Sequence, residues 1–143
     1  MADTVKTDTH LKRTTILVND CTRSIAFYRD VLGMKEYYNQ TMSVGGKIIP
    51  AGELGAEVHL GIMEGNRTDI AKLGILEWTG PRLPDNPGFA DRTRLGIGDV
   101  VFVCETLDMD PLIARLNASS ECRIHSRPTT GPCRRRMAVA KYK

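Results

Sequence analysis

The sequence predicts an α+β fold built from two successive modules, in each of which a strand is followed by a helix and further strands. Three observations support this prediction. Residues 13–33 have the pattern of a strand, a capped turn and a helix. Residues 98–120 repeat that order farther along the chain. Between the modules, residues 81–88 contain three prolines and a glycine, which exclude regular structure and indicate a linker.

The first strand and helix are the best-defined elements. Every second residue of 13–18, beginning with Thr14, belongs to one strand face, and this face is predicted to pack on the helix. Asp20 stands at the N-cap position, where its carboxylate can accept from the free N–H groups of the first helical turn. Apolar side chains then recur at helical spacing, and Gly33 is expected to end the helix in a left-handed conformation.

Three more strands complete the first module, which is predicted to span residues 12–80. Their patterns place them at residues 34–40, 58–63 and 73–79. Glu77 lies in the last of these strands among apolar neighbours, which is unusual for a carboxylate. An edge-strand charge that reaches solvent is the simpler explanation of Glu77, and a functional carboxylate is the alternative.

The second module is predicted over residues 98–143, after a linker at 81–97. A strand at 100–103 opens it, and Cys104 at the end of this apolar run is expected to be a buried small hydrophobe. Asp110 fits the N-cap of the following helix, and Pro111 fits its first position, where the missing N–H has no cost. Two further strands are predicted, around residues 122–125 and 137–140.

Composition and charge restrict the class of protein. At 143 residues the chain is long enough for one domain, preceded by a polar leader at residues 1–11, and its net charge of +3 is too small to indicate nucleic-acid binding. No apolar run has the length of a membrane span, and the first residues lack the pattern of a secretory signal. The four cysteines have no CxxC spacing, which favours a reducing cytoplasm.

The residues after the first strand carry a resemblance to a known superfamily. Asp20, the run Ser24-Ile25-Ala26-Phe27-Tyr28 and the pair Leu32-Gly33 closely resemble the opening of vicinal-oxygen-chelate proteins. This superfamily includes glyoxalases, bleomycin-resistance proteins and extradiol dioxygenases. Over nearly the whole chain, the resemblance implies paired βαβββ units whose curled sheets enclose a cavity. It also implies that the second module lacks its last strand, which a partner chain or residues beyond Lys143 would supply.

The resemblance also implies positions for metal ligands. In metal-dependent members of the superfamily, the ligands come from the first and last strands of each module. These positions fall on Arg13, Glu77 and Asp99 in this sequence, and Arg13 has no lone pair to offer a metal ion. Glu77 and Asp99 therefore remain as metal ligands, for a divalent ion such as Fe, Mn, Zn or Ni. An ion-paired cluster of Arg13, Glu77 and Asp99 facing the cavity is the alternative.

Three further residues complete the expected cavity. If Val58 and its alternate neighbours cover the helix, His59 points into the cavity and is a candidate for proton transfer, with Glu77 as the second catalytic residue. A hydrogen-bonded histidine without a catalytic role is the alternative. Tyr37 and Met63 are expected to contact a ligand together with Arg13 and Asp99, in an apolar pocket with a few polar anchors.

Two functions follow from the resemblance. The first is a protein that handles a small molecule by binding it, as bleomycin-resistance proteins do, with an absent or non-standard metal centre. The second is a metal-dependent lyase, isomerase or dioxygenase acting on a substrate with vicinal oxygens. Both imply a small-molecule partner, a homodimer and a cytoplasmic protein, without a nucleic acid or a membrane as partner.

Overall fold

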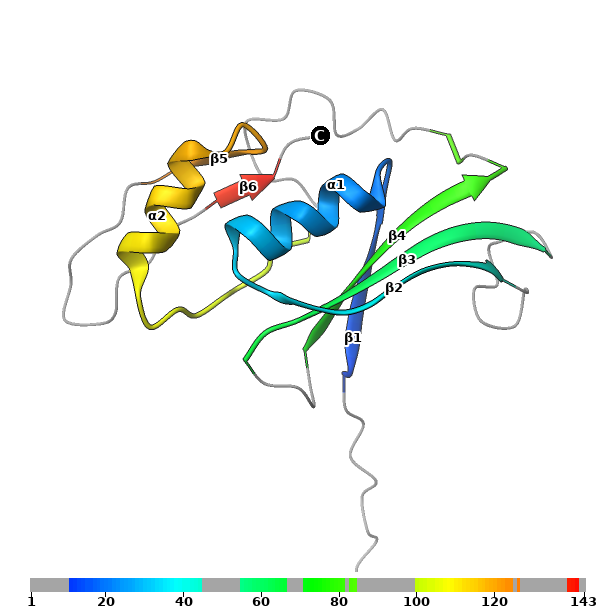
Figure 1. Ribbon diagram of the computed structural model, residues 1–143, viewed down its shortest axis with the longest axis horizontal. Helices are drawn as coiled ribbons and strands as arrows, with labels where there is room; N and C mark the ends of the chain where they lie inside the picture. The colour runs from blue at the N-terminus through cyan, green and yellow to red at the C-terminus, as the bar shows by residue number, and fades with distance from the viewer. Residues whose placement is uncertain are drawn as a thin grey trace, which may run out of the picture. The chain divides into compact units, whose positions relative to one another are not determined.

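The computed structural model describes residues 11–44, 55–66, 71–81, 83–84, 100–124, 126 and 139–141. The chain divides into two compact units, Met1–Pro81 and Arg82–Lys143. In its described part, the first unit holds a helical segment and a curled four-stranded sheet that does not close (Figure 1). The second holds a helix and two short paired strands. The mixed α+β class predicted from the sequence is confirmed.

The helical segment of the first unit forms as its sequence predicts. Helix α1 (Cys21–Ala26) continues directly into a π-helical turn, η1 (Phe27–Val31). Asp20 caps α1, since its carboxylate accepts from the backbone N–H of Arg23 at 2.7 Å. Gly33 follows the segment with a φ of +75°, a left-handed conformation that glycine adopts without a steric penalty. The predicted N-cap and the predicted terminating glycine are both confirmed.

The sheet of the first unit has the strand order β1-β4-β3-β2. Strand β1 (Arg13–Val18) runs parallel to β4 (Lys72–Gly80). Strand β3 (Ala56–Glu64) is antiparallel both to β4 and to β2 (Lys35–Val44). The three strands predicted after the helix are therefore present, with bounds shifted by a few residues.

Strand pairing assigns the side chains of the sheet to two faces. Residues paired across neighbouring strands lie on one face, and the register joins Ile16 to Ile75 and Ile75 to Gly61. Helix α1 covers this face: Cys21 Sγ lies 3.5 Å from the Ile75 carbonyl oxygen. A Cβ atom added at Gly61 would lie 2.5 Å from Ile25 Cδ1. We call this side of the sheet the helix face.

The other side, which we call the opposite face, carries the alternate residues of each strand. Thr15, Gly74, Ile62 and Tyr38 lie on it in register across the four strands. The side chain of Thr15 lies over Gly74, where an added Cβ would be 2.5 Å from Thr15 Oγ1. On β1, the residues of the helix face are half-buried and those of the opposite face are exposed, as the sequence predicts.

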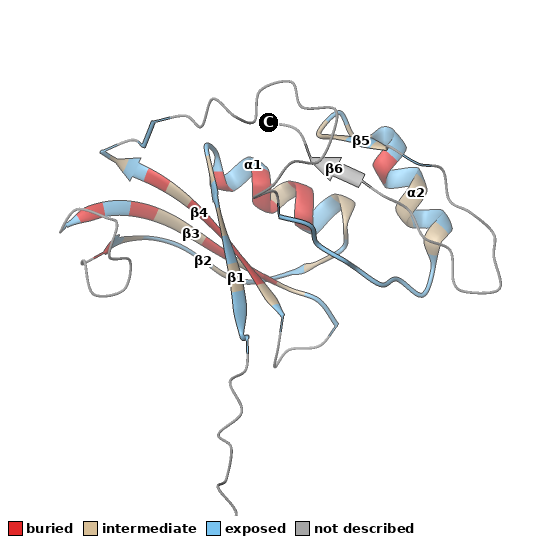
Figure 2. Ribbon diagram, turned by 180° about the vertical axis from the view of Figure 1, so that it is seen from behind, coloured by how far each residue is buried: buried red, intermediate tan, exposed pale blue. Residues whose placement is uncertain are grey.

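The main core lies between α1 and the helix face. Ile25, Ile75 and Met63 expose only 2%, 0% and 0% of their surface. Figure 2 shows this burial along the middle of β3 and β4 and on α1. Gly61 allows the close approach of the helix, because the absent side chain leaves room for Ile25.

The second unit contains α2 (Met109–Ala118), β5 (Cys122–Ile124) and β6 (Val139–Lys141), with β5 and β6 antiparallel. The prediction of Asp110 as the N-cap was wrong. Asp108 caps α2, and its carboxylate accepts from the backbone N–H of Asp110 at 3.2 Å. Pro111 still lies in the first turn, where a backbone N–H has no partner within the helix.

The strand predicted at residues 100–103 was also wrong. Residues 100–106 are in neither a helix nor a strand, and Val103 exposes 92% of its surface. An apolar β-branched run permits a strand but does not create one, because a strand requires a paired neighbour for its backbone. Cys104, which was expected to be buried, is exposed.

Several predictions fall outside the described residues. They concern residues 1–10 of the leader, most of the linker at 81–97, and Asp99. Among the helices that the structure describes, none has the length and apolar composition needed to cross a membrane.

Candidate functional site

A row of charged residues crosses one end of the opposite face. Arg13 on β1 pairs in register with Lys72 on β4, and Lys35 on β2 pairs with Glu64 on β3. The ammonium group of Lys72 joins the two pairs, since it lies 3.2 Å from Glu64 Oε2. The row therefore contains three cations and one carboxylate, a formal charge of +2 (3 − 1).

Lys72 is held between a carboxylate and an aromatic ring. Its ammonium nitrogen lies 3.3 Å from the centroid of the Tyr37 ring, a cation–π contact. The side chains of Lys72 and Glu64 expose 17% and 13% of their surface, so solvent screens this ion pair less than a surface pair. Glu64 Oε2 is buried, and in the described part of the chain no donor meets it in hydrogen-bond geometry, despite the short distance to Lys72.

The other end of the opposite face is apolar. Leu76 and Trp78 on β4 form a buried cluster with residues of β2 and β3. The remaining members are Val44, Ala56 and Val58, with Met42 and Leu60 packed against them. Between this cluster and the charged row, Leu17 and Tyr37 expose 63% and 60% of their surface. The opposite face therefore changes from charged to apolar along the strands.

The structure places Glu77 on the helix face, which corrects the expectation that it faces a cavity with Arg13. Val18, Glu77 and His59 are in register across β1, β4 and β3. Glu77 Oε2 accepts the backbone N–H of Cys21 at 2.8 Å, at the N-terminus of α1. A carboxylate is stabilised there by the unpaired N–H groups and by the helix dipole.

His59 also lies on the helix face, so its predicted orientation was wrong. Its Nε2 atom is 2.6 Å from Asn39 Oδ1, while Asn39 Nδ2 donates to Glu36 Oε1 at 3.2 Å. Because the Asn39 amide nitrogen is the donor to Glu36, its oxygen is left to accept, and His59 Nε2 is therefore the protonated nitrogen. Neutral His59 would keep its free lone pair on Nδ1.

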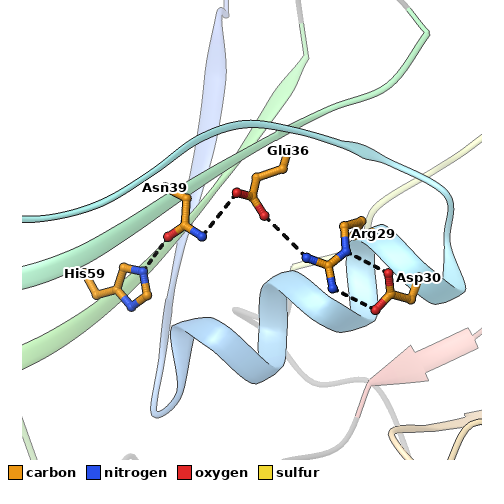
Figure 3. A network of polar contacts seen from close by, with 5 residues as sticks. All are labelled: Arg29, Asp30, Glu36, Asn39 and His59. Carbon is orange, nitrogen blue, oxygen red and sulfur yellow. Dashed lines mark hydrogen bonds and ion pairs between the residues drawn. The ribbon is translucent and has the colours of Figure 1, made fainter.

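The polar chain continues from β2 to the helical segment (Figure 3). Arg29 Nη1 lies 3.6 Å from Glu36 Oε2, and the guanidinium also binds both carboxylate oxygens of Asp30, at 2.7 and 2.9 Å. Hydrogen bonding to Asp30 raises the pKa of Arg29, and hydrogen bonding to Arg29 lowers that of Asp30. His59 is thus the end of a surface network that ties the helical segment to the sheet.

The other predicted site residues are separated by the sheet. Met63 is fully buried on the helix face, so it is not accessible to a ligand from the opposite face. Arg13 and Tyr37 belong to the opposite face, and Asp99 lies outside the described residues. Of the expected set, the structure therefore brings Arg13 and Tyr37 to one side of the sheet.

The residues of the first unit do not fit the metal site that the resemblance implies. Arg13 offers no lone pair, and the Glu77 carboxylate is on the other side of the sheet, bound to the α1 N-terminus. Where the structure describes the chain, no group of three His, Cys, Asp or Glu side chains lies close enough to hold a metal ion.

Sequence reasoning missed Lys72, Glu64 and Lys35. Glu64 ends one strand and Lys72 begins the next, so a hairpin pairing would have placed them opposite each other. Their charges at strand ends have the appearance of ordinary solvated residues. The register across four strands, rather than any local motif, brings them together with Arg13.

Comparison with known proteins agrees with this architecture. The family model of the Glyoxalase/Bleomycin resistance protein/Dioxygenase superfamily matches residues 10–141. A crystal structure of a glyoxalase family protein from Bacillus cereus is similar with a TM-score of 0.71, at 15% sequence identity, over 96% of this chain and 90% of that chain. No curated protein matches significantly. The chain belongs to the Glyoxalase/Bleomycin resistance protein/Dioxygenase superfamily.

Proposed function

We propose that this protein binds a small molecule on the opposite face of the first unit, with a metal centre that is absent or non-standard. The observation that carries the proposal is the change of the face from a buried apolar cluster around Trp78 to the charged row at Lys72. Between them Leu17 and Tyr37, which expose 63% and 60% of their surface, supply accessible apolar area, and binding sites for small molecules combine apolar surface with a few polar anchors. Arg13 and Tyr37 keep their proposed role as ligand contacts, while Met63 on the helix face does not.

The alternative is a metal-dependent lyase, isomerase or dioxygenase. It requires His59 or Glu77 to reach a substrate, and both belong to the helix face, where Glu77 binds the N-terminus of α1. We therefore propose a structural role for Glu77.

The homodimer and the cytoplasmic location implied by the sequence belong to the proposal of a protein that binds a small molecule. The free thiols of Cys21, Cys104 and Cys122 support a reducing compartment.

Trp78 provides the test of small-molecule binding, because it is the chain's single tryptophan and lies on the opposite face. Titration with octan-1-ol, an uncharged apolar probe, is expected to change its fluorescence saturably. Leu17→Asp should weaken this binding about fivefold, since a charge replaces apolar contact area. Leu107→Asp is the matched control, because Leu107 is 99% exposed and belongs to the second unit. No saturable change, or equal losses in both variants, would contradict the proposal.

The structural role of Glu77 predicts a loss of stability that does not depend on metal. Glu77→Gln is expected to lower the free energy of unfolding by about 1–2 kcal/mol, because the charged acceptor at the α1 N-terminus is replaced by a neutral one. Glu57→Gln, at an exposed position of β3, should change it by less than about 0.5 kcal/mol.

Urea unfolding with added Zn²⁺ or Ni²⁺, compared with EDTA, distinguishes the two roles of Glu77. The difference between wild type and Glu77→Gln should be the same in both conditions. A metal ion that stabilises the wild type but not the variant would identify Glu77 as a ligand, and the structural assignment would then be wrong.

A further inference from the structure

The charged row determines which chemical class of ligand suits the opposite face. Glu64 is the only carboxylate among its four residues, and its buried oxygen lies beside the Lys72 ammonium. The charge of Lys72 is thereby compensated locally. Arg13 and Lys35 flank this pair on β1 and β2, and no carboxylate in the described part of the chain forms an ion pair with either. Two uncompensated cations therefore border the face at this end.

The apolar part of the face begins next to the charged row. Thr15, Gly74 and Ile62 form the next row, and Leu17, Leu76 and Leu60 follow in register. Gly74 has no side chain, and the side chain of Thr15 from the neighbouring strand lies nearest to the space above it, between Lys72 and Leu76. A ligand lying along the strands would thus place one end at the cations and the other against apolar side chains.

We propose that the ligand is an amphipathic organic anion, with its anionic group at Arg13 and its apolar body along Leu17 toward the Trp78 cluster, while Lys35 on the other edge strand adds positive charge at this end of the face. This inference rests on the proposed function. Arg13 presents a guanidinium, whose planar donor set suits a carboxylate or phosphate group. Lys72 is held in place on this face, because the Tyr37 ring and the Glu64 carboxylate both contact its ammonium group. The alkyl chain of Lys72 then contacts the ligand.

A set of three eight-carbon probes tests the sign of the ligand charge. Trp78 fluorescence titrations with octanoate, octan-1-ol and octylammonium are expected to give the tightest binding for octanoate and the weakest for octylammonium. Each exposed cation should favour the anion about two- to fivefold. This preference should decrease with added salt, because the cations are solvent-exposed.

Charge-removal variants locate the anionic group. Arg13→Gln combined with Lys35→Gln should abolish the preference, so that octanoate and octan-1-ol bind with equal affinity. Lys12→Gln is the matched control. It also removes one positive charge, but from the neighbouring residue, whose side chain alternates in direction with that of Arg13. The preference for octanoate should remain in this variant. A loss of preference in Lys12→Gln equal to that in the double variant would show a general charge effect and overturn the inference.

The outcomes separate this inference from the proposed function. Binding of octan-1-ol without any preference for octanoate, or with tighter binding of octylammonium, would overturn the anion class and leave the small-molecule site standing. Failure of all three probes would overturn both. If light scattering shows a dimer that Leu17→Asp converts to monomers while no probe binds, a second copy of the chain occupies the face instead, and the inference is wrong.

Discussion

Replacing Ile25 with alanine is expected to lower the free energy of unfolding by about 2–5 kcal/mol. Ile25 is 2% exposed and lies directly over Gly61, where β3 approaches α1 most closely. Removal of its side chain leaves a cavity between α1 and the sheet that neighbouring residues can only partly fill. Urea unfolding monitored by Trp78 fluorescence measures the loss.

Leu17→Ala provides the control for this prediction. Leu17 belongs to the same sheet but is 63% exposed, so truncation should change the free energy of unfolding by less than about 1 kcal/mol. A loss below about 1 kcal/mol for Ile25→Ala would mean that α1 is not packed on β3 as the structure shows.

A double-mutant cycle with Gly61 sharpens the test. Gly61→Ala places a Cβ 2.5 Å from Ile25 Cδ1 and 2.8 Å from its Cγ1, so the single substitution should cost about 1–3 kcal/mol through overpacking. In the Ile25→Ala background both of these atoms are absent, and the same substitution should cost much less. Additive effects would contradict the direct contact between the two residues.

The local elements of the first unit could be predicted because their determinants are close in sequence. Asp20 and the N–H of Arg23 are three residues apart, so the cap depends on the chain around it alone. The left-handed φ of Gly33 depends similarly on one residue. In α2 the same reasoning selected Asp110 instead of Asp108, because both aspartates satisfy the local pattern. The turn in which Thr106 Oγ1 accepts the Asp108 N–H at 3.3 Å favours the earlier residue.

The sequence predicts the two alternating sets of residues in each strand, but it does not predict as well which set faces the helix. Alternation separates β3 into two sets but does not say which set meets the helix. The apolar set with Val58 and Leu60 predicts a helix-facing side and therefore a His59 that points away from the helix, whereas the register places His59 on the helix face. Gly61 carried the opposite information, since a strand glycine marks a close approach of another element. In the structure Ile25 occupies the space above Gly61.

The charged row was beyond sequence reasoning for a different reason. Arg13 and Lys72 are brought together only because β4 returns parallel to β1, after two intervening strands. Glu77 shows the converse case. The resemblance to the superfamily predicts a metal ligand at this position, yet the Glu77 carboxylate accepts from the backbone at the N-terminus of α1. The residue type at a position therefore does not determine on which face of the sheet the side chain lies.

The protein is expected to lose stability as the pH rises from about 9 to about 11, and Cys21 is a principal cause. Burial raises the pKa of the Cys21 thiol from 9.0 to about 11 in the folded protein. In the unfolded chain the thiol ionises near its ordinary value. Between the two values the unfolded state binds fewer protons than the folded state, so the free energy of unfolding falls as pH rises. The shift corresponds to about 2–3 kcal/mol, fully lost above about pH 11.

Cys21→Ala isolates this contribution from the lysines, tyrosines and other thiols that titrate in the same range. The variant should be less stable at neutral pH, because it loses buried volume beside Gly61, yet it should lose less additional stability between pH 9 and 11 than the wild type. Urea unfolding at several pH values gives both curves, and their difference is the thiol's contribution. Since Cys21 is fully buried with its Sγ at the Ile75 carbonyl, ionisation would place an unpaired charge beneath α1. Parallel curves from pH 9 to 11 would mean that the thiol reaches solvent, and that α1 does not seal this side of the sheet.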